Sequence, residues 1–206
     1  MKKLLSLCLC ALLACCLVLP VCADDSYFGE YAGDVYTNRE AGIMFTLPGG
    51  WFYADEDTLN EALDNAAGMV DNETFRATIE AGKELTVMLA GDSNGNSLNI
   101  VATNLPSAQY SILQQEGEGV LLDSVADSVE ATFTQMGFTV VSKSIGSRII
   151  NGTEKKCLSI QLTYYGMELN VVQFFQVRKD FLFCVTMLAI GDDSVVADTL
   201  SHVFLS

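Results

Sequence analysis

The chain has 206 residues, 50% of them hydrophobic, and a formal net charge of −15 at pH 7. The hydrophobic fraction excludes an intrinsically disordered protein, because a chain of this length and composition can bury a sizeable core. The charge excludes a protein that binds nucleic acid through a basic surface, since such a chain repels phosphates.

The first 23 residues have the pattern of a signal peptide. Two lysines precede an apolar run at 4–19, and small residues at 21 and 23 predict cleavage before Asp24. A membrane-spanning helix needs about 20 apolar residues, and Pro20 interrupts this run, so no transmembrane segment is expected after cleavage. Cleavage would remove five of the seven cysteines and two lysines, leaving 9 Lys/Arg against 26 Asp/Glu, a net charge of −17.

A second route of processing stays open. The sequence "LLAC" at 12–15 fits a lipobox, in which Cys15 would carry the lipid anchor. Secretion and lipid anchoring both place the protein outside the cytoplasm. We expect residues 24–32 to form an exposed lead-in and residues 33–206 to form a single domain, because no repeat or low-complexity linker divides them.

The N-terminal part of the domain begins with two strands, at 34–38 and 42–47, joined by the turn "REAG". Pro48, Gly49 and Gly50 make a second turn before Trp51. We interpret Trp51, the only tryptophan, as a structural plug that closes one end of the core rather than as a ligand platform. Two helices are expected to follow, the first capped by Asp57 or Thr58 and the second at 73–82.

The middle of the chain predicts a hairpin and two helices. Strands at 84–90 and 97–104 flank Asn94-Gly95, a dipeptide typical of tight hairpin turns. A short helix begins at Pro106-Ser107. A longer helix at 119–136 has apolar residues at three- and four-residue steps and ends at Gly137.

The last third predicts a β-meander with strands at 138–150, 153–165, 167–178 and 181–190. Its central strands are apolar on both faces, which is typical of a sheet covered on both sides. A C-terminal helix begins after Asp192 or Asp193, with Val203 and Phe204 facing inward. The elements therefore predict an α+β fold: a largely antiparallel sheet with helices on both faces.

The segment "YTNREAGIMFTLPGGWFYAD" at 36–55 resembles the "gi-F-lP-gW" hairpin of the PsbP-like family. The run at 148–189 resembles the long paired strands of the same family. This family belongs to an α/β/α superfamily shared with a Ran-binding nuclear-import protein. The resemblance covers residues 33–205 and implies an α/β/α sandwich and a role in binding or assembly. No residue matches a photosystem-contact or GTPase-contact motif, so no functional residue follows from it.

Catalytic and metal-binding signals are weak throughout. His202 is the only histidine, and no "GxSxG" elbow accompanies it, so we interpret it as an ordinary helix-terminal residue. The loop from Asp92 places oxygen side chains at positions 1, 3 and 5 of a calcium loop but has Ser97 and Thr103 where glycine and glutamate are needed. No glycine-rich loop has the context of a phosphate site. We therefore expect no catalytic, cofactor or metal site.

Cys157 and Cys184 are the two cysteines left after cleavage. The meander places them two strands apart, roughly 9–10 Å, with Cys157 opposite Phe175 or Gln176. A disulfide needs Cα atoms within about 7 Å, so both thiols are expected to be free and buried. Tyr164 and Tyr165 lie at a hairpin tip; we expect tip packing, with a partner surface as the alternative.

Three functional hypotheses follow. The first is a non-enzymatic extracytoplasmic binding or assembly module of the bacterial cell envelope, with a protein partner. The second is a hydrolase of envelope glycans, which would need two carboxyl groups facing each other across a cleft. The third is a carrier of a lipid or small ligand, which would need an internal cavity. The absence of a catalytic motif and the PsbP-like resemblance favour the first.

Overall fold

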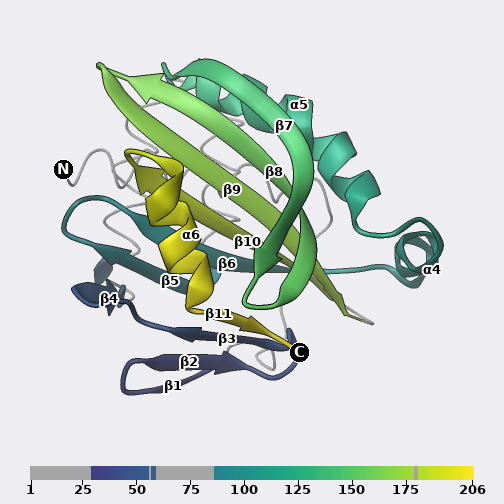
Figure 1. Ribbon diagram of the computed structural model, residues 1–206. Coiled ribbons are helices and arrows are strands. Elements are labelled where there is room, and N and C mark those ends of the chain that lie inside the picture. The colour runs from purple at the N-terminus through teal and green to yellow at the C-terminus, as the bar shows by residue number, and fades with distance from the viewer. Residues whose placement is uncertain (1–28, 56, 59–85, 179–180) are drawn as a thin grey trace.

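The computed structural model describes residues 29–55, 57–58, 86–178 and 181–206 (Figure 1). The predictions for the signal peptide, for Cys15 and for most of the two helices before residue 86 lie outside these residues. Where the first of those helices begins, the backbone N–H of Thr58 donates to the carboxylate of Asp55 at 2.8 Å. The cap is therefore Asp55, not Asp57 or Thr58, and the helix begins earlier than expected.

A seven-stranded antiparallel sheet forms the centre of the molecule, in the order β4-β5-β6-β10-β9-β8-β7. The predicted hairpin and the four-stranded meander are both confirmed, and β10 joins them by pairing with β6 on one side and β9 on the other. The strands are β4 (Trp51–Tyr53), β5 (Thr86–Asp92), β6 (Ser97–Asn104), β7 (Thr139–Ile150), β8 (Thr153–Tyr164), β9 (Met167–Arg178) and β10 (Phe181–Ile190).

A four-stranded sheet packs beside the first, in the order β1-β2-β3-β11. Its strands are β1 (Glu30–Ala32), β2 (Val35–Asn38), β3 (Ile43–Thr46) and β11 (Val203–Leu205). The last strand corrects the predicted C-terminal helix, which ends at Ser201. Val203 is buried as expected, whereas Phe204 points to solvent because the chain has changed from helical to strand alternation.

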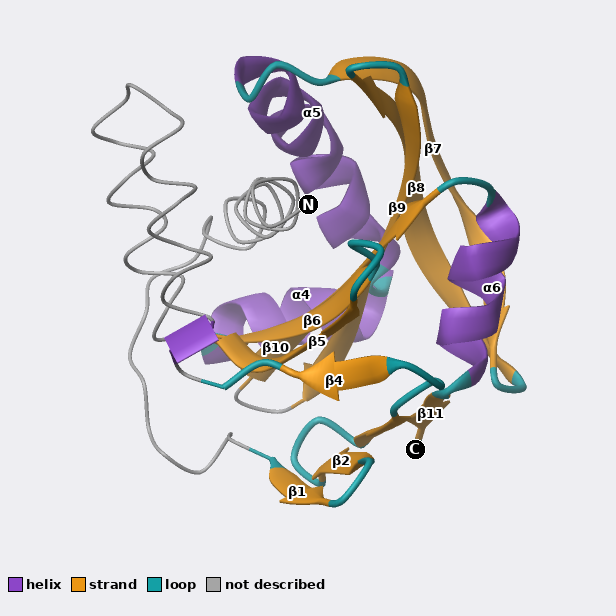
Figure 2. Ribbon diagram, turned by 90° about the vertical axis from the view of Figure 1, so that its left-hand side faces the viewer, coloured by secondary structure: helices purple, strands orange, loops and turns teal. Residues whose placement is uncertain are grey.

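Helices cover both faces of the large sheet, as the α+β prediction requires. Figure 2 shows α5 (Gly119–Gln135) and α6 (Asp193–Ser201) on opposite sides of β7–β9, while α4 (Ser107–Glu116) lies on the α5 side. α5 ends at Gln135, and Gly137 follows its C-terminal cap Met136 with a φ of 85°, in the left-handed region. No helix among the described residues is long and apolar enough to cross a membrane.

Each face of the large sheet has its own hydrophobic core, because alternate residues of the buried strands point to opposite sides. The α5-side core contains, among others, Leu122, Val125, Val129 and Phe133 of α5, and Leu89, Val101, Leu158, Val171, Phe175 and Leu188 of the sheet. The α6-side core joins Val196 and Leu200 of α6 to Phe174, Phe183 and Met187, and to Tyr36, Ile43 and Phe45 of the small sheet.

Trp51 packs against the α6-side core from β4, one of the two edge strands of the large sheet. Its ring meets that of Phe45 edge-on, with centroids 6.1 Å apart. The structural role expected for Trp51 is therefore confirmed, although the side chain is only half-buried. Tyr53 lies in the same strand, and its hydroxyl donates to the carbonyls of Asp34 and Phe45, at 3.1 Å each.

Candidate functional site

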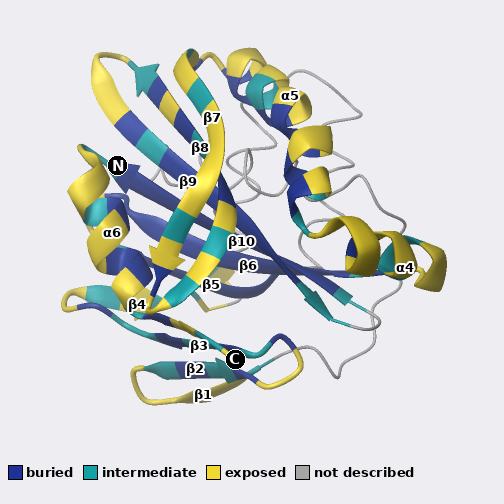
Figure 3. Ribbon diagram, turned by 45° about the vertical axis from the view of Figure 1, so that its right-hand side comes forward, coloured by how far each residue is buried: buried dark blue, intermediate teal, exposed yellow. Residues whose placement is uncertain are grey.

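β7 is an open edge of the large sheet. It is 12 residues long and, among the described strands, pairs with β8 alone, while Figure 3 shows it largely exposed beside the buried β9 and β10. Val141 and Ile149 are 60% and 68% exposed. The extra residue at Val141, where the register with β8 shifts, makes a β-bulge near the start of the strand.

A cleft of about 370 Å³ lies on the α6 side of this edge. We call it the polar cleft, because hydroxyl and amide side chains dominate its lining. The lining residues are Ser142, Ser144 and Arg148 of β7, Ser159, Ile160 and Gln161 of β8, Asn170, Val171 and Val172 of β9, and Asp193 of α6.

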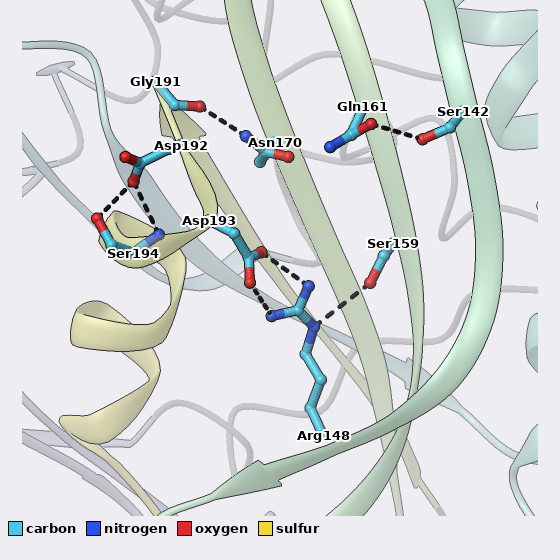
Figure 4. Close-up of polar contacts among 9 residues, drawn as sticks. All are labelled: Ser142, Arg148, Ser159, Gln161, Asn170, Gly191, Asp192, Asp193 and Ser194. Atoms are coloured by element: carbon cyan, nitrogen blue, oxygen red, sulfur yellow. Dashed lines mark hydrogen bonds and ion pairs between the residues drawn. The ribbon is translucent and has the colours of Figure 1, made fainter.

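An ion pair between Arg148 and Asp193 closes one end of the polar cleft. Figure 4 shows the Arg148 side chain reaching from β7 to the first turn of α6. Its Nη1 and Nη2 donate to the two carboxylate oxygens of Asp193 at 2.9 and 2.8 Å, and its Nε donates to Ser159 Oγ at 3.4 Å. The hydrogen bonds to Asp193 raise the pKa of Arg148 above its ordinary value, so the guanidinium stays charged. The two charges of the lining therefore neutralise each other.

The other polar groups of the cleft are held by neutral hydrogen bonds. Ser142 Oγ donates to Gln161 Oε1 at 2.8 Å, and Asn170 Nδ2 donates to the carbonyl oxygen of Gly191 at 2.6 Å (Figure 4). Asp192 caps α6 by accepting from the backbone N–H of Ser194 at 2.9 Å. Because Ser142 donates to an amide and not to a base, nothing in this contact activates it as a nucleophile.

A smaller cleft of about 110 Å³ continues from the polar cleft, since Gln161 and Asn170 line both. The β8–β9 hairpin tip is next along the same strands. There Tyr164 packs on Phe138, with ring centroids 4.6 Å apart, whereas Tyr165 is 88% exposed with φ 48°. The expected tip packing thus holds for Tyr164, and Tyr165 presents an aromatic ring to solvent.

The described residues place His202 at a helix end. It follows α6 as its C-terminal cap, and its backbone carbonyl accepts from the N–H of Thr46 at 3.1 Å. The described residues make no hydrogen bond to its imidazole. Within the polar cleft, Asp193 is the only acid of the lining, and Arg148 engages both of its oxygens.

The loop after Asp92 is a hairpin turn, as its Asn-Gly dipeptide predicts. The Asp92 carboxylate accepts from the backbone N–H groups of Asn94, Gly95 and Asn96 at 2.9 to 3.0 Å, and from the side-chain amides of both asparagines. These bonds occupy the oxygens that a calcium loop would direct at the ion. In the described part of the chain, no three His, Cys, Asp or Glu side chains converge on one point.

Cys157 and Cys184 are free and buried, which confirms the prediction. The strand register differs slightly from the expected one, because Leu158 lies opposite Gln173. The separation is larger than strand order alone implies, since Cys184 belongs to the α5-side core and Cys157 to the α6-side core. Burial raises the pKa of the Cys157 thiol to about 11.

Sequence reasoning did not single out the residues of the polar cleft. Its serines and amides are common surface residues, and no spacing marks them. Arg148 and Asp193 are 45 positions apart and meet only because the meander folds back under α6. The one available signal was the polar alternation in "SKSIGSR" at 142–148, which contrasts with the apolar strands that follow.

Fold and cleft together describe an α+β protein in which the long edge strand β7 lies beside a neutral polar cleft. No protein-family model and no curated protein matches the chain. Among solved structures it is similar to PsbP of the cyanobacterium Synechocystis sp. PCC 6803, with a TM-score of 0.47 and 11% identity over 91% of this chain and 99% of that one. The expected similarity to PsbP is thus found.

Two further solved structures are similar to the chain. One is a protein of Bacteroides thetaiotaomicron, with a TM-score of 0.42 and 9% identity over 80% of this chain and 45% of that one. The other is LpqN of Mycobacterium tuberculosis, described as involved in cell envelope biogenesis, with a TM-score of 0.37 and 13% identity over 80% of this chain and 83% of that one.

Proposed function

We propose that this protein is a non-enzymatic, extracytoplasmic binding or assembly module of the bacterial cell envelope, and that a protein partner binds at β7 and the polar cleft. One observation carries the proposal: a 12-residue edge strand has its outer side unpaired in the sheet, next to a cleft lined by hydroxyl and amide groups.

The edge strand suits a partner that binds as an additional strand. Its outward N–H and C=O groups offer main-chain hydrogen bonds to an extended segment. Ser142 and Ser144 face the polar cleft, whereas Ile145, opposite Leu158 of the α5-side core, faces the other side. A partner segment that alternates small polar and apolar residues would complement both sides of the edge.

Binding fits the cleft better than hydrolysis does. A glycosidase uses two carboxyl groups, about 5–10 Å apart, on either side of the scissile bond. The cleft lining supplies Asp193 alone, already paired with Arg148, while hydroxyls and amides can donate and accept hydrogen bonds with a neutral polar ligand.

Site-specific photocrosslinking in cells tests the interface. We expect a crosslinker placed at Ser144 or Ser147 of β7 to trap one discrete protein, and one placed at Ser111 on α4 to trap none. A proline scan sharpens the result. Of two consecutive residues in β7, one directs its N–H to β8 and the other directs it outward, so only one proline should lower the melting temperature. The proline at the position whose N–H points outward should leave the melting temperature unchanged and abolish the crosslink, because it removes a main-chain donor to the partner. Equal labelling from α4, or a crosslink to a second copy of the chain, would contradict the proposal.

The location needs a separate measurement. Secretion predicts a mature N-terminus at Asp24, and anchoring predicts a diacylated or triacylated Cys15. Intact-mass analysis of protein from envelope and culture-medium fractions distinguishes the two. An unprocessed chain in the cytoplasm would refute both.

A further inference from the structure

The smaller cleft of about 110 Å³ differs in its walls from the polar cleft that it continues. The β-bulge shapes one wall: Val140 packs against the α5-side core, whereas Val141, the extra residue, is 60% exposed and lines the cleft. Leu162 and Leu169 belong to the lining as well. A single water needs about 10–15 Å³, so this cleft has room for a group of several atoms beside apolar side chains.

Glu168 carries the one unbalanced charge in the described lining of the two clefts. Arg148 and Asp193, the other charged residues of this lining, neutralise each other. The Glu168 side chain is exposed and makes no ion pair or hydrogen bond with another described residue. The smaller cleft is therefore negative, whereas the polar cleft is neutral.

Two further hydrogen-bond acceptors lie beside Glu168. Asn170 directs its Nδ2 to the carbonyl oxygen of Gly191, so its Oδ1 faces Gln161 of β8 (Figure 4). Thr163, directly opposite Glu168 on β8, adds a hydroxyl oxygen. A guanidinium group has five N–H donors and no acceptor, and its planar fork fits a carboxylate through two hydrogen bonds. The acceptors of the smaller cleft match such a group.

We propose that the smaller cleft binds an arginine side chain of the protein partner, with the guanidinium on Glu168 and the methylene stem against Val141. This inference rests on the proposed function. Gln161 and Asn170 line both clefts, so a partner that covers the polar cleft also covers the entrance to the smaller one. Covering takes the Glu168 carboxylate out of water, which costs free energy unless a positive group replaces the water.

Charge and shape select arginine among the side chains of a partner. An acidic side chain would face Glu168 without a counter-charge, and the chain as a whole, with a net charge of −15, repels acidic partners and attracts basic ones. A lysine ammonium is a compact, strongly hydrated point charge, whereas a guanidinium is flat and more weakly hydrated. Arginine therefore loses less hydration in a cleft with apolar walls.

Nα-acetylarginine amide and its citrulline counterpart test the cleft directly, because the two compounds have nearly the same shape and differ in charge. With the protein as its cells produce it, NMR titration should show the arginine compound binding about fivefold or more tighter. Salt at about 0.15 M screens the general negative field of the protein. Intermolecular NOEs from the methylene protons of the arginine compound should reach the methyl groups of Val141.

Two variants that remove the same charge provide the comparison. Glu168→Gln should lower the affinity for the arginine compound to that for the citrulline compound. Glu154→Gln should leave it unchanged, since Glu154 is an exposed acid of β8 outside the lining of both clefts. Both positions are exposed, so both variants should fold. Equal binding of the two compounds, or an equal loss of affinity in the two variants, would overturn the proposal.

Crosslinking in cells separates this proposal from the proposed function. Glu168→Gln should lower the yield of the crosslink from Ser144, and Glu154→Gln should not. An unchanged yield in Glu168→Gln would overturn the arginine contact while leaving the partner at β7 in place. Binding of the arginine compound without any crosslinked protein would instead refute the proposed partner.

Discussion

The ion pair between Arg148 and Asp193 connects β7 to α6 and gives the most specific energetic prediction. We would replace Arg148 by Met, which keeps an unbranched apolar stem, and Asp193 by Asn, which keeps the shape of the carboxylate. The parent, the two single variants and the double variant form a double-mutant cycle. The cycle gives the coupling free energy between the two side chains, separated from the packing that each makes on its own.

The expected magnitude follows from the geometry and the exposure. Exposed ion pairs contribute about 0.2–1 kcal/mol, and fork-shaped pairs with two hydrogen bonds lie at the upper end. The side chains of Arg148 and Asp193 are 27% and 55% exposed, so solvent still screens the pair. We therefore expect a coupling of about 1 kcal/mol. Arg148→Met alone should cost slightly more, because it also loses the hydrogen bond to Ser159.

Urea unfolding of the four proteins measures the coupling, and 1 M NaCl should reduce it. Lys143 and Asp127 form the matched control: they also bridge β7 and a helix, but Asp127 is 95% exposed. That cycle should give a clearly smaller coupling free energy, because solvent screens a fully exposed carboxylate. If Arg148→Met were as stable as the parent, or if both cycles gave the same coupling, the assignment of Arg148 as the link between β7 and α6 would be wrong.

Three other predictions concern the cores and the small sheet. Cys157 and Cys184 should resist iodoacetamide at pH 8 in the folded protein and react fully in urea, because both thiols are buried. For Cys157, burial also raises the pKa of the thiol to about 11. Fast labelling of the folded protein would contradict this. Burial also raises the pKa of Tyr53 from 10.0 to about 12, so the folded state holds that proton more tightly than the unfolded state. The contribution of the Tyr53 proton to the free energy of unfolding is complete below pH 10 and is lost as the pH rises towards 12. When the free energy of unfolding is measured against pH, Tyr53→Phe should flatten the curve in this range. Leu200→Ala should lower the free energy of unfolding, measured in urea, by about 2–4 kcal/mol, because Leu200 is buried. Asp198→Ala, at an exposed position of the same helix, should lower it by less than about 0.5 kcal/mol. Equal losses would mean that α6 does not pack as described.

Local sequence chemistry predicted most elements of this fold. Asn94-Gly95 fixed the β5–β6 hairpin because glycine takes the left-handed conformation there, with φ 100°. The three- and four-residue steps in 119–136 marked α5, and the paired turns marked the meander. The free thiols followed from strand order, although the register was shifted slightly.

Errors occurred where distant segments compete for the same residues. The residues 203–205 continue a helical pattern, yet they pair with the edge of β3 that β2 leaves free, beside the α6-side core. The start of the first helix was misplaced by a similar ambiguity, since several acids could cap it and only the backbone path selects Asp55.

The sequence by itself determined most of the helices and strands, and that both faces of the sheet are covered, because hydrophobic periodicity and turn residues act over a few positions. Only the tertiary structure decided which strand is left as the open edge and which polar groups meet. Ser142 and Arg148 of β7 share a cleft with Asp193 of α6, which is 45 positions from Arg148. Such contacts depend on which segments far apart in the chain become neighbours, and no local pattern encodes that choice.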